Sequence, residues 1–126
     1  MLFRSQGLAE LDVLHADIQG HEGEMLEGAA EALAARRIGR IFISTHSEKL
    51  HAEIESTLRA AGYVIEVSSG VDAHTTSCDG LVFASAPGLP PVVRGWRPLG
   101  RLDILRASPA ALLDSLAPRR GPPPAG

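Results

Sequence analysis

The chain has 126 residues, 44% of them hydrophobic and 21% charged, which is the composition of a globular protein and excludes a fibrous or wholly disordered one. This length allows one hydrophobic core and excludes a second large domain. A formal net charge of -3 excludes a general attraction to nucleic acid or to an anionic membrane surface. The single cysteine, Cys78, excludes an internal disulfide framework and favours a reducing, cytoplasmic setting.

The first part of the chain predicts a strand that turns directly into a helix. Leu11–Ile18 is mainly apolar, as in a buried strand, and beyond the turn residue Gly20 apolar residues recur at helical spacing as far as Arg37. Gly28 lies inside this helical run, where glycine costs about 1 kcal/mol relative to alanine. We therefore expect the helix to kink or to be capped again at Gly28 before it continues.

The middle of the chain alternates strands and helices. Arg40–His46 is short, β-branched and aromatic, as expected for a central strand covered on both faces. A helix capped by Ser47 or by the preceding His46 is predicted to run as far as Gly62. The remaining predicted elements are a strand at Tyr63–Val67, a polar loop over 68–77 and a strand at Asp79–Ser85.

This order of elements predicts an α/β fold. Strand–helix–strand units wind right-handed onto a parallel sheet. The fourth strand is reached by a loop alone, whereas a parallel connection needs about a dozen residues or more, so we expect this strand to run antiparallel to its predecessor. The predicted sheet therefore has parallel strands and one antiparallel strand at its C-terminal end.

From Ala86 onward the composition shifts to proline and arginine, which predicts a tail rather than a core. Within this tail, a capping Ser108 followed by a proline predicts a short amphipathic helix near 108–117. Trp96 and Ile104–Leu105 are either lightly packed anchors or exposed. The predicted organisation is a lead-in over 1–10, an α/β domain over 11–86 and a tail over 87–126.

Three residues are candidates for chemistry: two lie at strand ends and one lies in the helix turn that follows the first strand. Ligands of open α/β sheets bind outside the carboxyl ends of the strands, which is where Asp17 and His46 fall. If their strands are neighbours, these two side chains form a pair that can deprotonate a hydroxyl. Glu22 follows in the first turn of a helix, where an acidic residue also gains from the helix dipole without any function. The structural alternatives are that Asp17 caps this helix and that His46 is a cap or a surface group.

A metal site is a second interpretation of this region. Four nearby residues carry atoms that bind metals: His15, Asp17, His21 and Glu22. They do not follow a recognised ligand spacing, so no metal ligand is assigned. His15 is instead interpreted as a hydrogen-bonded strand residue, and two further residues are also interpreted as structural: His51 on a helix face and Cys78 as a small buried side chain.

A longer motif spans the first strand end and the following helix. The segment Asp17-Ile-Gln-Gly-x-Glu22-x-x-x-Leu-x-Gly-Ala29 resembles the Asp-x-Glu-Gly-x-Glu-x-x-x-Leu-x-Gly-Ala segment of FkbM-family methyltransferases. Those enzymes move a methyl group from S-adenosylmethionine, most often to a hydroxyl. The strand ends at Phe42–His46 and Asp79–Ala84 extend the resemblance, which covers about Leu8 to Ser85. Gln19 stands where many family members have glutamate, and it supplies hydrogen bonds but no charge.

The resemblance implies a Rossmann-like class I methyltransferase sheet, in which these segments are the fourth to seventh strands. It implies S-adenosylmethionine as cofactor. A divalent metal is suggested only by the two acidic groups a short turn apart, and the neutral Gln19 weakens that interpretation. The resemblance also implies catalytic roles for Asp17, Glu22 and His46, and cofactor contacts for Asp17 and Gln19. The glycine-rich turn that binds the cofactor in this fold does not occur before Leu11, so we expect the chain to be the C-terminal half of such an enzyme. Asp79 and Gly80 open the family's last strand, where loop-bonding and turn roles explain them.

Two functions follow as hypotheses. One is methyl transfer to a hydroxyl of a sugar or natural product, with a small-molecule or glycan acceptor as the partner. The alternative is a non-catalytic fragment that serves as a binding or assembly module. An exposed half-sheet favours a homo-oligomer or a complementing N-terminal half, and neither nucleic acid nor a membrane is expected as a partner. A different doubly wound nucleotide- or phosphate-binding domain is a third possibility, although the sequence has no glycine-rich phosphate loop.

Overall fold

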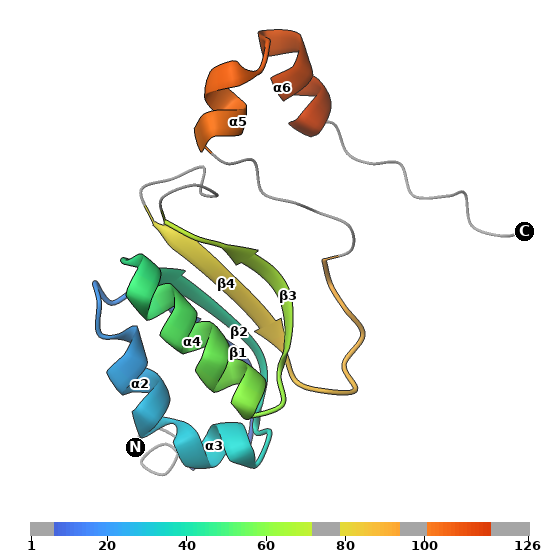
Figure 1. Ribbon diagram of the computed structural model, residues 1–126. Helices are drawn as coiled ribbons and strands as arrows, with labels where there is room; N and C mark the ends of the chain where they lie inside the picture. Colours follow the sequence, from blue (N-terminus) through green and yellow to red (C-terminus); the bar gives the residue numbers. More distant parts are fainter. Residues whose placement is uncertain (1–6, 72–78, 94–100, 117–126) are drawn as a thin grey trace, which may run out of the picture.

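The computed structural model describes residues 7–71, 79–93 and 101–116, which form one four-stranded sheet, three helices beside it and two short helices near the C-terminus (Figure 1). The elements in chain order are β1 (Leu11–Ala16), α2 (Glu22–Gly28), α3 (Ala30–Ala34), β2 (Ile38–Thr45), α4 (Glu48–Ala60), β3 (Val64–Ser69), β4 (Gly80–Ser85), α5 (Arg101–Arg106) and α6 (Pro109–Leu116).

The sheet has the strand order β1-β2-β4-β3. β1 and β2 pair in parallel, whereas β4 is antiparallel to both of its neighbours, β2 and β3. The mixed α/β fold and the antiparallel pairing of the last strand with its predecessor are therefore confirmed. The sequence did not reveal that β4 inserts between β2 and β3, so β1 and β2 are the one hydrogen-bonded parallel pair of this sheet.

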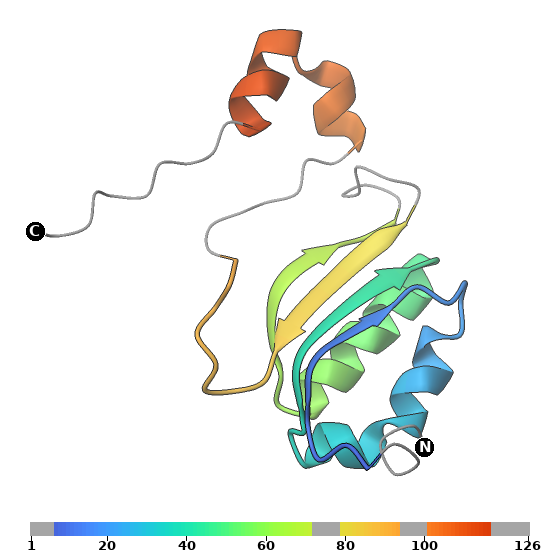
Figure 2. The same cartoon turned by 180° about the vertical axis from the view of Figure 1, so that it is seen from behind.

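The hydrophobic core lies between the sheet and the helices α2, α3 and α4, which all cover the same face (Figures 1 and 2). Alternate residues of the two central strands point into it, because side chains of a strand alternate between faces. Ile41 and Ile43 of β2 and Val82 of β4 are fully buried there. The Tyr63 hydroxyl enters the same core and donates a 2.7 Å hydrogen bond to the Ile38 carbonyl.

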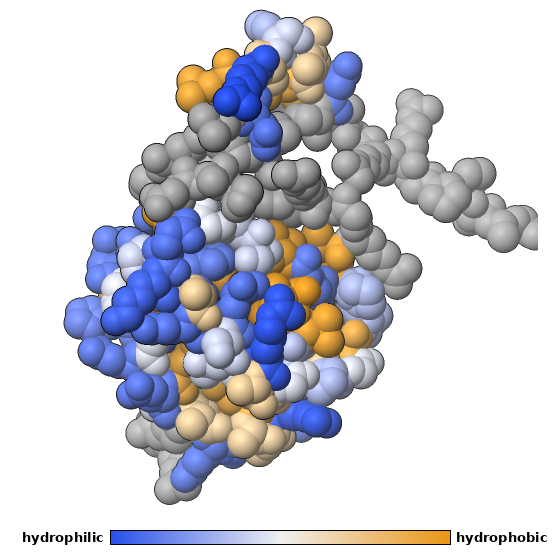
Figure 3. All heavy atoms as spheres, in the orientation of Figure 1, coloured by the Kyte–Doolittle hydropathy of each residue, from blue (hydrophilic) through white to orange (hydrophobic). Residues whose placement is uncertain are grey.

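The ends of α4 follow the sequence signals, whereas α3 ends at Ala34, before the predicted Arg37. The hydroxyl of Ser47 accepts a hydrogen bond from the Leu50 amide and so caps α4, and Gly62 follows the helix with a φ of 84°. The predicted break at Gly28 is observed, since α2 ends there and α3 begins at Ala30. Figure 3 shows mainly hydrophilic side chains on the helical side of the molecule, with hydrophobic residues gathered over the β3 and β4 side.

The opposite face of the sheet carries aromatic rings and a half-buried carboxylate, that of Glu66. The rings of His15 and Phe42 meet edge to face with centroids 5.2 Å apart. Glu66 of β3 accepts hydrogen bonds from the Ser85 hydroxyl and from the amides of Val92 and Val93, at 2.7 and 2.8 Å for the amides. Burial raises the pKa of Glu66, but these hydrogen bonds outweigh it and hold the pKa below its ordinary value. The residues after β4 are thus bonded to the sheet as far as Val93.

Several expectations need correction or lie beyond the described residues. β3 runs to Ser69, so the predicted loop over 68–77 begins later than expected, and α5 is not predicted by the sequence at all. α6 lies within the predicted helix 108–117. Cys78 and Trp96 lie outside the described residues. In the part of the chain that the structure describes, no helix has the length and apolar character needed to cross a membrane.

Candidate functional site

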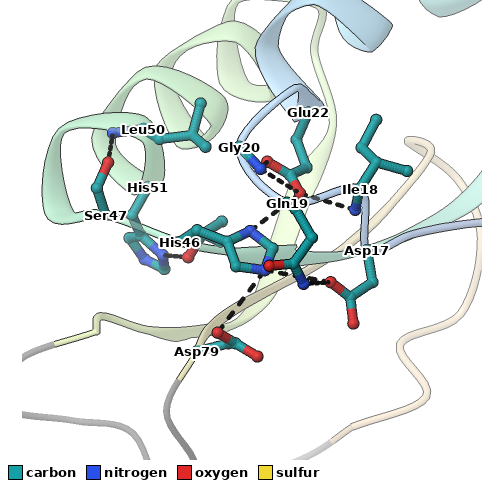
Figure 4. A network of polar contacts seen from close by, with 11 residues as sticks. Asp17, Ile18, Gln19, Gly20, Glu22, His46, Ser47, Leu50, His51 and Asp79 are labelled. Carbon is teal, nitrogen blue, oxygen red and sulfur yellow. Dashed lines mark hydrogen bonds and ion pairs between the residues drawn. The ribbon is translucent and has the colours of Figure 1, made fainter.

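The candidate site lies where β1 and β2 end (Figure 4). Asp17 directly follows β1, and His46 directly follows β2, and the parallel pairing of these strands brings the two residues to the same edge of the sheet. The Nε2 atom of His46 lies 3.2 Å from Oδ1 of Asp17. The Asp17 side chain is 43% exposed and the His46 side chain 16% exposed, so the pair forms a half-open mouth. The sequence indicates this pair on the condition that the two strands are neighbours, and they are.

Glu22 lies beneath this pair and is fully buried. One carboxylate oxygen accepts a 3.0 Å hydrogen bond from the Ile18 amide, and the other accepts a 3.1 Å bond from the Gly20 amide. The Nδ1 atom of His46 lies 3.0 Å from the same carboxylate. Burial raises the pKa of Glu22, but the backbone hydrogen bonds and the nearby His46 outweigh it and lower the pKa below its ordinary value. Glu22 is therefore an anion that holds the turn and faces the imidazole.

The turn between β1 and α2 has a shape that makes this contact possible. Gln19 has a φ of 57° and Gly20 a φ of 99°, both in the left-handed region. Glycine adopts this region freely, which explains its presence at position 20. Gln19 pays a conformational cost there and is exposed, and its side-chain amide donates a 3.4 Å hydrogen bond to Asp17. The turn thus points two backbone amides at Glu22 and leaves Asp17 at the surface.

The sequence did not predict that Asp79 belongs to this site. Thr45 of β2 pairs with Gly80 of β4, so the residue before β4 comes to lie beside the residue after β2. Asp79 Oδ1 is accordingly 3.7 Å from His46 Nε2. The sequence does place a polar Asp79-Gly80 pair at the start of this strand. That pair indicates a contact with His46 only once β4 is known to pair with β2.

His46 is therefore surrounded by three carboxylates. Its two ring nitrogens have essentially no accessible surface, and within the described residues neither nitrogen is aligned for a hydrogen bond, despite the short distances to Glu22 and Asp17. Ligand atoms of Asp17, Glu22 and His46 all lie within 4.8 Å of one another, which suits a bound cation. The same arrangement can also take a proton from a hydroxyl at the mouth.

The remaining histidines lie elsewhere. His15 is exposed and packs against Phe42, rather than forming the predicted hydrogen-bonded strand residue. His21 pairs with Glu24 at 2.7 Å on the exposed surface of α2. The four-residue metal set considered from the sequence is thus not assembled, because His46 takes the place of both histidines beside Asp17 and Glu22.

His51 was expected on a helix face but is buried in a separate polar cluster. Its Nδ1 atom lies 2.8 Å from the Thr45 hydroxyl and its Nε2 atom 2.8 Å from the Ser68 hydroxyl. A Cβ atom at Gly80 would overlap the Thr45 hydroxyl and lie 3.2 Å from the His51 ring. This cluster joins α4 to strands β2 and β3 and has satisfied hydrogen bonds, so it is structural.

Comparison with known protein families gives one match. The family described as Methyltransferase FkbM domain matches residues 1–65, just over half of the chain. The match includes Asp17, Glu22 and His46 and ends within β3, so the resemblance seen at Asp79–Ala84 lies beyond it. Searches of curated proteins and of solved structures give no significant match.

Proposed function

Because the chain belongs to the FkbM methyltransferase domain family, we propose that it takes part in methyl transfer from S-adenosylmethionine to a hydroxyl group of a sugar or natural product. The observation that carries this proposal is the Asp17–His46 pair at the mouth of the sheet, within the segment that matches the family. A carboxylate beside an imidazole at a strand end can orient a hydroxyl and receive its proton.

In the proposed reaction the acceptor hydroxyl hydrogen-bonds to the exposed carboxylate of Asp17. The cofactor, when bound, supplies an electrophilic methyl group. The acceptor oxygen would form the new bond to this methyl carbon while the bond from that carbon to the sulfonium sulfur breaks, so that S-adenosylhomocysteine would leave and the hydroxyl proton would pass to Asp17. Placement contributes most of the rate, because an activated methyl group needs chiefly a nucleophile held in line with it. Oδ1 of Asp17 lies 3.2 Å from Nε2 of His46, which leaves the second carboxylate oxygen for the acceptor.

Glu22 has a different role from Asp17 in this proposal. Its side chain has no accessible surface and is engaged by the amides of Ile18 and Gly20, so it does not contact an acceptor. It positions the site through the Nδ1 side of His46. Glu22 is therefore a positioning residue, whereas Asp17 and His46 face the acceptor.

The cofactor side of the proposal rests on fewer groups. We assign contacts with S-adenosylmethionine to Asp17 and Gln19, whereas the amides of Ile18 and Gly20 donate their hydrogen bonds to Glu22. The described residues supply no glycine-rich cradle for the adenosine part, so no step is assigned through it. β1 forms one edge of the sheet, and its Val13 side chain is 54% exposed. We therefore include in the proposal that β1 pairs with a complementing N-terminal half or with a second copy of the chain.

The antiparallel ending of the sheet supports assignment of the chain to the C-terminal half of a class I methyltransferase sheet. β4 runs opposite to its neighbours, as expected for the last strand of that fold. A cytoplasmic setting and a small-molecule or glycan acceptor are part of the same proposal.

Methyl transfer from S-adenosylmethionine carrying a labelled methyl group tests the proposal. The purified chain is incubated with a panel of hydroxylated sugars and natural products, alongside the variants Asp17→Asn and His46→Asn. Asp12→Asn is the matched control, because Asp12 is an exposed carboxylate on the same strand outside the site. We expect transfer to fall at least ~100-fold in both site variants, as for loss of a general base, and to persist in the control.

Binding of S-adenosylmethionine is measured by calorimetry on the same samples. Transfer that is equally fast in Asp17→Asn would overturn the assignment of the site. A chain that is folded by circular dichroism, yet neither binds the cofactor nor transfers the methyl group, would overturn the enzymatic proposal. That result would favour the non-catalytic binding module.

A further inference from the structure

We propose that His46, Asp17 and Asp79 form a binding site for a divalent transition-metal ion, with Glu22 as the residue that orients the histidine. The inference deepens the proposed function, on which it rests only for the use of the ion in catalysis. Binding of the ion itself is a property of these side chains and can be measured without a cofactor or an acceptor.

The balance of charge at the site favours a cation. Three carboxylates surround the imidazole of His46: Glu22 at 3.0 Å, Asp17 at 3.2 Å and Asp79 at 3.7 Å. A protonated imidazole supplies one positive charge against three negative ones. A divalent ion between the imidazole and the two outer carboxylates would compensate this excess more fully and would reduce their mutual repulsion.

The distances fit shared coordination better than hydrogen bonding. A charge-assisted N–H···O bond is about 2.7–2.9 Å long and well aligned. The two contacts of Nε2, at 3.2 and 3.7 Å, are longer. Two ligand atoms each ~2.1 Å from one zinc ion lie ~3.4 Å apart in a tetrahedral site. Both contacts fall near this spacing, and the described residues offer neither nitrogen of His46 an aligned hydrogen bond.

On its buried side His46 contacts a carboxylate, as metal-binding histidines usually do. Such histidines usually direct one ring nitrogen at a carboxylate, which fixes the tautomer and leaves the other nitrogen to the metal. Here Nδ1 faces Glu22, which is itself held by the amides of Ile18 and Gly20. Nε2 is thereby directed toward Asp17 and Asp79 at the mouth (Figure 4).

The donor set indicates the class of ion. One imidazole nitrogen with carboxylate oxygens suits Mn²⁺ or Zn²⁺, with further positions left for water or for an acceptor oxygen. An acceptor hydroxyl bound to the ion would lose its proton more readily, because a divalent metal lowers the pKa of a bound oxygen acid. That proton passes to the Asp17 oxygen that does not bind the ion, so the roles of Asp17 in the two proposals are compatible.

Titration with Mn²⁺, followed by electron paramagnetic resonance of the free ion, tests the site, and calorimetry with Zn²⁺ repeats the measurement. The site variants are Asp79→Asn and His46→Gln. The control is His21→Gln, which removes an exposed histidine that also lies close to a carboxylate, Glu24, at 2.7 Å. We expect one ion per chain, at least ~10-fold weaker binding in each site variant, as for loss of one ligand or its support, and no change in the control. Circular dichroism establishes that each variant is folded.

Three results would overturn the inference: no saturable binding of Mn²⁺ or Zn²⁺ up to millimolar concentration by the folded chain, binding that is unchanged in both site variants, or binding that is lost in His21→Gln. The outcome is separable from that of the proposed function. Methyl transfer that survives complete chelation of metal would overturn the use of the ion in catalysis and leave both ion binding and the methyltransferase proposal intact. One bound ion in a chain that shows no methyl transfer would support the metal site and count against the methyltransferase proposal.

Discussion

Replacing Glu22 by glutamine tests whether this buried carboxylate holds the turn at the candidate site. Glu22 accepts hydrogen bonds from the amides of Ile18 and Gly20 on different oxygens. Glutamine keeps one acceptor oxygen, but its NH₂ group faces the other amide, and an unsatisfied buried donor costs about 1–3 kcal/mol. The retained bond becomes neutral and loses about 1 kcal/mol. We therefore expect Glu22→Gln to lower the free energy of unfolding by about 2–4 kcal/mol.

Urea unfolding followed by circular dichroism measures this loss, with an unchanged dependence on urea as the sign that the native fold is kept. Glu24→Gln is the matched control, because Glu24 lies in the same helical turn but is 75% exposed beside His21. An exposed ion pair contributes about 0–1 kcal/mol, so the control should change little. A loss of unfolding free energy below about 0.5 kcal/mol in Glu22→Gln, or an equal loss in Glu24→Gln, would refute the reasoning. Either result would mean that the hydrogen bonds from the two turn amides do not depend on the negative charge of Glu22.

Three further predictions concern the scaffold. Gly80→Ala should lower the free energy of unfolding by about 1–3 kcal/mol in urea, because its Cβ would overlap the Thr45 hydroxyl; Gly28→Ala, whose Cβ meets nothing within 4 Å, should not destabilise the chain. Tyr63→Phe should cost about 1–2 kcal/mol in the same assay, since the buried carbonyl that its hydroxyl bonds would be left unsatisfied. The pKa of Glu66 is lower in the folded chain than its ordinary value of 4.5, so the ionised Glu66 stabilises the fold at pH values above 4.5. This contribution is lost as the pH falls through the lower, folded-state pKa. The free energy of unfolding, measured between neutral and acidic pH, should fall less steeply with pH in Glu66→Gln than in the unchanged chain. Identical pH profiles of the two proteins would contradict a stabilising role of the Glu66 carboxylate.

The local elements of this fold could be predicted because their signals are local. The β-branched run at β2 and the Ser47 cap with Gly62 at the two ends of α4 each act over a few residues. The break at Gly28 is of the same kind, since a glycine weakens a helix wherever the helix lies. α5 was missed because its short apolar pattern stands in a segment of proline and arginine, where composition indicates a tail.

The position of β4 could not be predicted, because it depends on contacts between distant residues. A loop connection from β3 favours an antiparallel pair, and that pairing is observed. The length of this loop does not predict which strand pairs with the other edge of β4. The crossover through α4 leaves room for one strand between β2 and β3, and β4 occupies it.

The candidate site divides in the same way. Asp17 and His46 could be brought together from the sequence because each ends a strand and consecutive parallel strands are usually neighbours. Asp79 required the insertion of β4 beside β2, and the buried state of Glu22 required the left-handed turn at Gln19 and Gly20. His51 lies on a helix as expected, but its burial could not be predicted, since its partners Thr45 and Ser68 come from two different strands.

The different origins of these residues bear on how the site works. The pair that faces the mouth depends on the two parallel strands within the family match, whereas Asp79 depends on β4, which lies beyond it. A change that displaces β4, such as a larger side chain at Gly80, should therefore move Asp79 away while Asp17 and His46 stay together. If the ion requires Asp79 and proton transfer requires only Asp17, Gly80→Ala will weaken Mn²⁺ binding more than it weakens metal-free methyl transfer. Equal losses of both would show that the two roles depend on one rigid site.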